Sequence, residues 1–445
     1  MSFTTQDPFT GKALATYEYA PKRQVLESIA ILSTSSVQWR QLNPRVRQER
    51  LLAVADRLGK QKDSFAELIT SEMGKPGKEA QIEILKCKTT IERACSADLD
   101  FLVPRLNDGF DVEHIPLGVI YSIMPWNYPF WQVIRMAVPA ILAGNTILLK
   151  HSELTPLTAL AIEELFAGIF EMPVLLNHFI SHEMTDFILS QPEVGGVSLT
   201  GSVNAGRIVS KVAAEYFKKA VLELGGSDPY IVCADADLKL AAAIITKGRL
   251  LNSGQSCICA KRAIVSREVL PQFLELLRLE FDKYEYGTDI GPLAGTRFKI
   301  AIAKQVQELL QATSAKQFYG KPNLQNPDSA FVDAEIYLLS ANSNWLRNQE
   351  FFGPVLLVIP FDSDNEAIEI ANATDFGLGG GVFSQNVRAA KKLAARIAAG
   401  QVAVNEIVST DLSRPFGGVK NSGIGRELGT ESYFEFTQTK VITTA

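Results

Sequence analysis

Two cysteines, Cys257 and Cys259, stand two residues apart in LNSGQSCICAKR, directly after a small, polar stretch. Such a stretch is typical of a loop and would leave a thiol accessible at the mouth of a domain. A tetrahedral zinc site needs four ligands, and no second cysteine pair lies near these thiols. His178 and His182 are spaced by four residues, but no third ligand accompanies them. We therefore expect no metal site. The segment alone leaves a nucleophilic cysteine and a buried structural cysteine equally open.

Two further polar side chains follow apolar runs. Glu223 closes the run in VLELGGSDP and precedes two glycines, which allow a ligand to approach, so its carboxylate is a candidate general base. Asn127 follows Trp126 in IMPWNYPFW, where its amide could stabilise an oxyanion. Each has a plainer interpretation: an exposed charge at the end of a strand for Glu223, and the N-cap of the next helix for Asn127.

The segment SLTGSVNAG has the pattern of a strand, a tight turn and the start of a helix. Backbone amides at such a helix start, together with the Ser202 hydroxyl, would suit a pyrophosphate. The segment lacks the G-x-G-x-x-G spacing, so an ordinary strand-to-helix turn remains equally open.

The elements that must position these residues follow from apolar periodicity. Apolar residues at three- and four-residue intervals predict that residues 21–100 are mostly helical. From residue 118, short apolar runs alternate with helical stretches over 130–142, 156–170 and 204–217, which predicts a parallel sheet built from βαβ units. A second alternation begins near residue 228 and predicts a second α/β domain. The final segment, YFEFTQTKVITTA, alternates like an exposed strand that could extend another sheet, including a neighbouring subunit's.

Length and composition exclude several classes of protein. A chain of 445 residues is expected to form two or three domains, and a net charge of −5 argues against general nucleic-acid binding. The most apolar segment, 133–149, is interrupted by polar residues, glycine and proline and is shorter than a membrane span. Five cysteines are too few for a disulfide framework, and the first residues do not read as a secretion signal. We therefore expect a cytoplasmic protein with no membrane or nucleic-acid partner.

Taken together and in order, seven segments resemble the NAD(P)-dependent aldehyde dehydrogenase superfamily: PWNYPFW, GNTILLKHSELTPL, LTGSVNAG, LELGGSDP, NSGQSC, EFFGPV and RPFGGVKNSGIGRE. The resemblance implies an α/β subunit of three parts. These are a Rossmann-like NAD-binding domain of residues 1–97 and 118–226, an α/β catalytic domain of residues 227–428, and a small β extension for oligomerisation of residues 98–117 and 429–445. It also implies a homodimer or homotetramer.

The resemblance implies a role for each candidate residue. Cys257 would attack the aldehyde carbonyl, while Asn127 and the backbone NH of Cys257 hold the oxyanion. Loss of hydride to nicotinamide would leave a thioester, and Glu223 would activate the water that hydrolyses it.

The cofactor positions implied by the resemblance surround the ribose, pyrophosphate and nicotinamide groups; they are Trp126, Lys150, Glu153, Thr200, Gly201, Ser202, Glu350 and Phe352. Lys150 and Glu153 would contact the adenosine ribose. A carboxylate near the ribose 2′ position hydrogen-bonds a free hydroxyl and repels a 2′-phosphate, so Glu153 predicts NAD in preference to NADP.

Within the superfamily, GQSCICAKR and ELGGSDP are similar to the succinate-semialdehyde dehydrogenase branch. Arg135 matches a position where that branch often binds the substrate carboxylate, and a structural ion pair is an equally open interpretation. Thr410 lies near a position where a serine often binds the same group, whereas a second arginine of some members is replaced by Leu251. We expect oxidation of succinic semialdehyde to succinate. The alternatives are oxidation of uncharged aldehydes and a cofactor-independent cysteine hydrolase or acyl transferase.

Cys259 is not needed for this reaction. One interpretation is a small apolar residue packed behind the loop. The other is a redox partner that forms a reversible disulfide with Cys257 and blocks the nucleophile.

Overall fold

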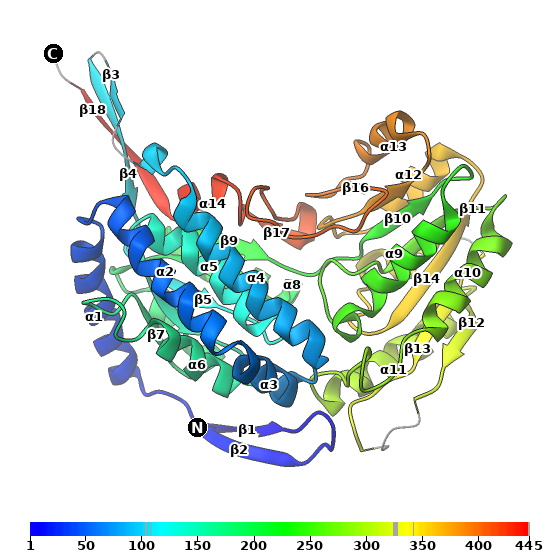
Figure 1. The fold of residues 1–445 in the computed structure, drawn as a ribbon, viewed down its shortest axis with the longest axis horizontal. Coiled ribbons are helices and arrows are strands. Elements are labelled where there is room, and N and C mark those ends of the chain that lie inside the picture. Colours follow the sequence, from blue (N-terminus) through cyan, green and yellow to red (C-terminus); the bar gives the residue numbers. More distant parts are fainter. Residues whose placement is uncertain (103–104, 108, 324–327, 341, 444–445) are drawn as a thin grey trace.

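Two mostly parallel sheets, one in each half of the molecule, organise the chain (Figure 1). The computed structural model describes residues 1–102, 105–107, 109–323, 328–340 and 342–443. The expected α/β architecture is confirmed, with helices on the faces of both sheets. None of the helices in these ranges is both long and apolar enough to cross a membrane.

Residues 22–96 are mostly helical, as the periodicity predicts. Its helices are α1 (Lys22–Trp39), α2 (Pro44–Lys60), α3 (Lys62–Met73) and α4 (Gly77–Ser96). The apolar faces of α2 and α3 pack on α4, which in turn packs on α5 (Pro129–Leu142). Helix α5 is buried along its whole length, because apolar residues surround it on all sides.

The first sheet has the strand order β17-β9-β8-β5-β6-β7, and all of its strands except β17 run parallel. Its strands are β5 (Val119–Ile123), β6 (Thr146–Lys150), β7 (Leu175–Asn177), β8 (Val194–Thr200), β9 (Lys219–Glu223) and β17 (Gly423–Ile424). Helices α5, α6 (Pro156–Phe166), α7 (Thr185–Leu189) and α8 (Val203–Glu215) connect them. The connections are the βαβ units predicted from residue 118 onward.

The second sheet has the order β12-β13-β14-β11-β10-β15-β16, with only β12 antiparallel. Its strands are β10 (Pro229–Val232), β11 (Arg262–Ser266), β12 (Lys316–Lys321), β13 (Ala334–Leu338), β14 (Val355–Phe361), β15 (Gly381–Phe383) and β16 (Ala403–Val404). Its helices are α9 (Leu238–Leu250), α10 (Leu270–Asp282), α11 (Thr296–Ala312), α12 (Asp364–Asn372) and α13 (Val387–Ala394).

Two small antiparallel sheets complete the fold. An N-terminal hairpin pairs β1 (Ser2–Gln6) with β2 (Ala13–Glu18). The other sheet has the order β18-β4-β3 and projects from the first half of the molecule (Figure 1). It consists of β3 (Arg105–Asn107), β4 (Phe110–Pro116) and β18 (Thr437–Thr443), which follows α14 (Glu431–Glu435).

The predicted domain boundaries remain predictions, and one element crosses them. Strand β17 falls within the segment 227–428 expected to form the catalytic domain, yet it pairs with β9 of the first sheet. Residues 103–104, 108 and 444–445 of the expected β extension lie outside the described residues.

Candidate active site

The carboxyl ends of four strands of the first sheet meet at one edge, and the candidate residues lie there. The register aligns Ile123 of β5 with Lys150 of β6 and with Leu199 of β8, and it aligns Thr200 with Glu223 of β9. Asn127 follows β5 by four residues. Parallel pairing therefore gathers residues that are up to about a hundred positions apart in the sequence.

Cys257 follows a tight left-handed turn between α9 and β11. Asn252, Ser253 and Gly254 have φ angles of 52°, 55° and 77°, which is costly for the two residues that carry a Cβ. The buried guanidinium of Arg249 supports this turn, because its Nη2 donates to the carbonyl oxygens of Gly254 and Gly353 at 2.8 and 2.6 Å. The nucleophile candidate thus lies on a backbone that is held in place.

Asn127 is tied directly to the cysteine turn. Its Nδ2 donates to the Gln255 carbonyl at 3.0 Å, and Asn252 Nδ2 donates to the Asn127 carbonyl at 2.8 Å. The side chain does not cap α5; instead Glu83 Oε1 accepts from the amides of Phe130 and Trp131, each at 3.0 Å. One amide hydrogen of Asn127 is used by Gln255, and the second is available to an oxyanion.

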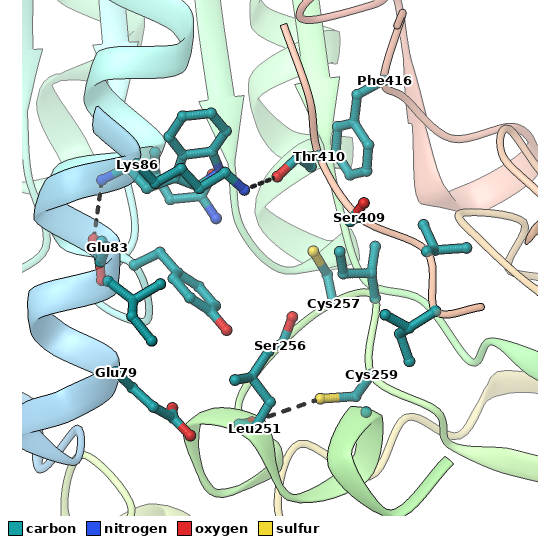
Figure 2. Close-up of a pocket in the computed structure, with 18 of the residues that line it drawn as sticks. Glu79, Glu83, Lys86, Leu251, Ser256, Cys257, Cys259, Ser409, Thr410 and Phe416 are labelled. Atoms are coloured by element: carbon teal, nitrogen blue, oxygen red, sulfur yellow. Dashed lines mark hydrogen bonds between the residues drawn. The ribbon is translucent and has the colours of Figure 1, made fainter. Parts of the chain in front are cut away.

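A cavity of about 210 Å³ opens on Cys257 (Figure 2). Helix α4 forms one wall, α5 a second, and the loop that carries Ser409 and Thr410 a third. Burial raises the pKa of the Cys257 thiol to about 12, although Arg135 and Lys261 act in the opposite direction. Burial therefore favours the protonated form of this thiol at neutral pH.

Glu223 is buried, and neither of its carboxylate oxygens has a hydrogen-bond partner within the described part of the chain. Burial raises the pKa of Glu223 well above its usual range, and the nearby Glu427 carboxylate raises it further. A Cβ on Gly417 would lie 2.9 Å from Glu223 Oε1, so a residue without a side chain is required beside the carboxylate. An unpartnered buried carboxylate at a strand end suits a general base.

Arg135 forms a buried ion pair with Glu427, and each side chain is only 2% exposed. Its guanidinium also lies 5.0 Å from the centroid of the Phe416 ring. The structural ion pair that the sequence left open is therefore present. Arg135 also lines the cavity, and its predicted contact with a substrate carboxylate stays a prediction.

The other expected cofactor positions lie on both sides of the cysteine loop. The Ser202 hydroxyl accepts from the Ala205 amide at 3.2 Å and caps α8, which leaves other first-turn amides available to a pyrophosphate. Trp126 and Phe352 meet edge to face with 5.8 Å between ring centroids. These backbone donors and flat aromatic faces fit a nicotinamide dinucleotide.

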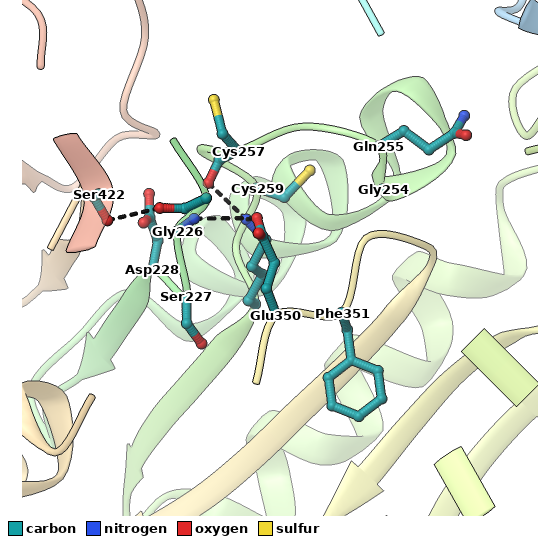
Figure 3. Close-up of polar contacts among 12 residues, drawn as sticks. Gly226, Ser227, Asp228, Gly254, Gln255, Cys257, Cys259, Glu350, Phe351 and Ser422 are labelled. Carbon is teal, nitrogen blue, oxygen red and sulfur yellow. Dashed lines mark hydrogen bonds and ion pairs between the residues drawn. The ribbon is translucent and has the colours of Figure 1, made fainter. Parts of the chain in front are cut away.

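Glu350 is held by contacts that include the cysteine loop (Figure 3). Its Oε1 accepts from Lys261 Nζ at 2.8 Å and from the Gly226 amide at 3.1 Å. Lys261 Nζ also donates to the Cys257 carbonyl at 2.6 Å. Glu350 is thus positioned beside the candidate nucleophile.

Near the expected adenosine ribose site, Glu153 is surrounded by donors. Its Oε1 lies 3.1 Å from the Tyr19 hydroxyl, 3.6 Å from His182 Nε2 and 3.8 Å from Lys150 Nζ. At the expected pyrophosphate site, Gly201 lies between Thr200 and Ser202. Its amide donates to the Glu223 carbonyl at 3.0 Å, which joins the end of β8 to the end of β9.

Three charged residues of the site were missed from the sequence: Lys86, Lys261 and Glu427. The only local signal was a charge within an otherwise apolar stretch, and it did not reveal which residue the charge contacts.

Cys259 is buried, and its Sγ lies 3.9 Å from the Leu251 carbonyl, away from the Cys257 sulfur (Figure 2). Its redox role stays a prediction. No three His, Cys, Asp or Glu side chains among the described residues gather to hold a metal ion.

Known proteins share this arrangement. The profile described as "Aldehyde dehydrogenase family" matches residues 1–442. The chain belongs to the aldehyde dehydrogenase family. It is therefore an NAD(P)-dependent oxidoreductase, and the resemblance based on the seven segments is confirmed.

Similar members of the family include two bacterial proteins named as succinate-semialdehyde dehydrogenases [NADP(+)]. The one from Deinococcus radiodurans is 36% identical over 452 residues, covering 99% of this chain and 94% of that protein. The one from Mycobacterium tuberculosis is 36% identical over 456 residues, covering 99% of both chains.

Solved structures of the family are also similar. The succinic semialdehyde dehydrogenase from Streptococcus pyogenes in complex with NADP+ has a TM-score of 0.95 and 31% identity, with 99% of both chains covered. Betaine aldehyde dehydrogenase from Staphylococcus aureus in complex with NAD+ has a TM-score of 0.93 and 26% identity, covering all of this chain and 91% of that one. Relatives of the same fold therefore bind either nicotinamide dinucleotide.

Proposed function

We propose that this aldehyde dehydrogenase oxidises succinic semialdehyde to succinate with NADP. The observation that carries the proposal is the cavity on Cys257, one end of which is lined by two cations, Lys86 and Arg135, and by the Thr410 hydroxyl. Cations and hydroxyl donors bind a carboxylate. The names of the two bacterial relatives support the same substrate.

In the proposed reaction, the Cys257 thiol releases its proton to water and Sγ attacks the aldehyde carbon, while Asn127 Nδ2 and the Cys257 amide stabilise the oxyanion. A bound nicotinamide dinucleotide supplies the acceptor for the hydride that the adduct loses. Glu223 then removes a proton from the water that attacks the thioester carbonyl, and succinate leaves as the thiol is released.

We infer NADP in place of the NAD that Glu153 alone predicted. That prediction considered the carboxylate without its surroundings. Because Lys150, His182 and the Tyr19 hydroxyl lie around it, its repulsion of a 2′-phosphate is partly offset. The NADP in the names of the relatives favours the same choice.

A two-by-two assay tests both parts of this proposal. Succinic semialdehyde and pentanal, which have similar chain length, are each supplied with NADP or NAD, and formation of the reduced cofactor is followed. We expect kcat/KM for succinic semialdehyde to exceed that for pentanal at least about tenfold, and NADP to be preferred. Equal efficiency with both aldehydes would contradict the substrate, and a preference for NAD would contradict the cofactor.

The same assay tests the alternative of a cofactor-independent hydrolase. That activity would release an acid from a thioester without forming any reduced nicotinamide. The positions of Trp126, Phe352 and the capped start of α8 favour the oxidoreductase.

A further inference from the structure

Lys86 of α4 reaches into the cavity that contains Cys257 (Figure 2). Its ammonium lies 4.0 Å from the centroid of the Trp131 ring and donates to Thr410 Oγ1. Figure 2 shows this contact joining the α4 wall of the cavity to the loop that carries Ser409 and Thr410. No feature of the sequence singled out this residue.

Two of the five charged side chains that line the cavity are held in buried ion pairs. Arg135 is paired with Glu427, and Glu83 is paired with the buried Lys75. Within the described ranges, no ion pair includes Lys86. Lys86 is partly buried. Partial burial of a cation without a counter-ion costs free energy, and an anionic ligand would offset that cost.

The contact between Lys86 and Thr410 presents only donors to a ligand. An ammonium group cannot accept a hydrogen bond, so Thr410 Oγ1 is the acceptor and its own hydroxyl hydrogen is directed elsewhere. Two ammonium hydrogens and one hydroxyl hydrogen therefore remain. This set matches the two oxygens of a carboxylate and offers nothing to a neutral alkyl chain.

We propose that Lys86, together with the Thr410 hydroxyl, is the principal binding site for the distal carboxylate of an ω-carboxy aldehyde, while Arg135 chiefly holds Glu427. This inference rests on the proposed function and names the residue that determines its substrate class. Lys86 is thus a substrate-binding residue, and it takes no part in bond making at the aldehyde carbon.

The charge of Lys86 should depend on pH within an accessible range. Burial lowers its pKa to about 8, and the nearby Arg135 of α5 lowers it further, whereas Glu83 and Cys87 of α4 and Asp411 of the opposite loop act the other way. Below pH 8 the ammonium is charged and binds a carboxylate. Above pH 8 the free enzyme loses that charge, so the KM for the acid substrate should rise.

The test compares the full-length enzyme with Lys86→Met, which keeps an unbranched chain on the Trp131 ring but removes the charge. We expect the KM for succinic semialdehyde to rise about 10- to 100-fold, with kcat changed less than about threefold. For pentanal, kcat/KM should change less than about threefold. Lys78→Met, at an exposed position of the same helix, is the matched control and should alter neither substrate.

Two further measurements keep the inference falsifiable. Calorimetry with succinate should detect binding to the unaltered enzyme and to Lys78→Met and a loss of binding in Lys86→Met. If Lys86→Met does not fold, the unaltered enzyme itself provides the test, because the ratio of the two KM values should increase above pH 8. Titration of the Cys257 thiol affects both aldehydes and cancels in that ratio.

The outcomes separate the two proposals. If the unaltered enzyme does not prefer succinic semialdehyde to pentanal, the proposed function fails and this inference fails with it. If the preference exists but Lys86→Met retains it, or if the KM ratio is unchanged across pH 8, the inference is overturned and the proposed function stands.

Discussion

At the scale of single residues, the site combines buried charges that compensate one another with a carboxylate, Glu223, that has neither a hydrogen bond nor an ion pair among the described residues. Glu223 lies near Glu427, whose own charge is paired with Arg135. Burial raises the pKa of Glu223, and the second carboxylate nearby raises it further. A base with a raised pKa binds a proton strongly and can take it from water.

Replacing Glu223 by glutamine should separate the two halves of the reaction. The thiol can still attack and the adduct can still be oxidised, but the water loses its base. We expect a rapid burst of about one reduced cofactor per subunit, followed by a steady-state rate at least about 100-fold below that of the unaltered enzyme. Stopped-flow absorbance measures both phases.

The pH dependence of the unaltered enzyme gives an independent check on Glu223. Because the pKa of Glu223 is raised in the folded enzyme, its carboxylate form accumulates only as pH rises. The steady-state rate should therefore increase with pH, whereas the pH dependence of the burst rate should not follow the titration of Glu223. A Glu223→Gln variant with normal steady-state turnover would contradict the role.

At the scale of elements, α4 positions the start of α5 and therefore the segment that carries Asn127. Glu83 accepts from the first amides of α5 and forms a buried ion pair with Lys75, which lies 3.7 Å from the centroid of the Tyr128 ring. One carboxylate thus caps a helix and neutralises a lysine, and the second function depends on its charge.

Glu83→Gln should be strongly destabilising. The amide oxygen can still accept from α5, but Lys75 is left buried without a counter-ion, so we expect a loss of about 3 to 5 kcal/mol in the free energy of unfolding. Glu92→Gln removes a partly exposed pair with Lys88 on the same helix and should cost less than about 1 kcal/mol. Urea denaturation compares the two variants, and equal losses would refute this account.

At the scale of the whole molecule, the three-stranded sheet of β3, β4 and β18 projects from the body and exposes apolar side chains. Phe110 and Val441 lie on one face of this sheet and are 42% and 57% exposed, whereas Ile442, which is 37% exposed, lies on the opposite face. Apolar side chains exposed together on a projecting sheet favour a contact with another chain. This agrees with the predicted homodimer or homotetramer, which stays a prediction.

Val441→Asp should weaken that association. A charge at this position opposes burial against a second subunit but leaves the pairing of β18 with β4 intact. We expect light scattering to show a smaller mass for the variant than for the unaltered enzyme. Thr439→Asp, elsewhere on the same strand, controls for the added charge; the same mass for Val441→Asp and the unaltered enzyme would contradict the prediction.

The sequence predicted what depends on local patterns. Periodicity indicated the N-terminal helices and the βαβ units from residue 118, and the ends of parallel strands necessarily bring Asn127, Lys150, Thr200 and Glu223 to one edge. It could not predict contacts that depend on tertiary packing. Lys86 meets Thr410 across 324 positions, and Glu153 meets Tyr19 across 134, so neither the carboxylate site nor the surroundings of Glu153 could be recognised from a segment.

The pairing of β17 with β9 also bears on how the enzyme is made. Gly423 aligns with Glu223, so the strand that covers the base is synthesised 423 − 223 = 200 residues after it. At about 5 to 20 residues per second, a ribosome needs roughly 10 to 40 seconds to supply it. During that interval the β9 edge is unpaired and open to other strands. A nascent chain therefore needs protection at this edge, and a product that stops before residue 423 lacks a complete active site.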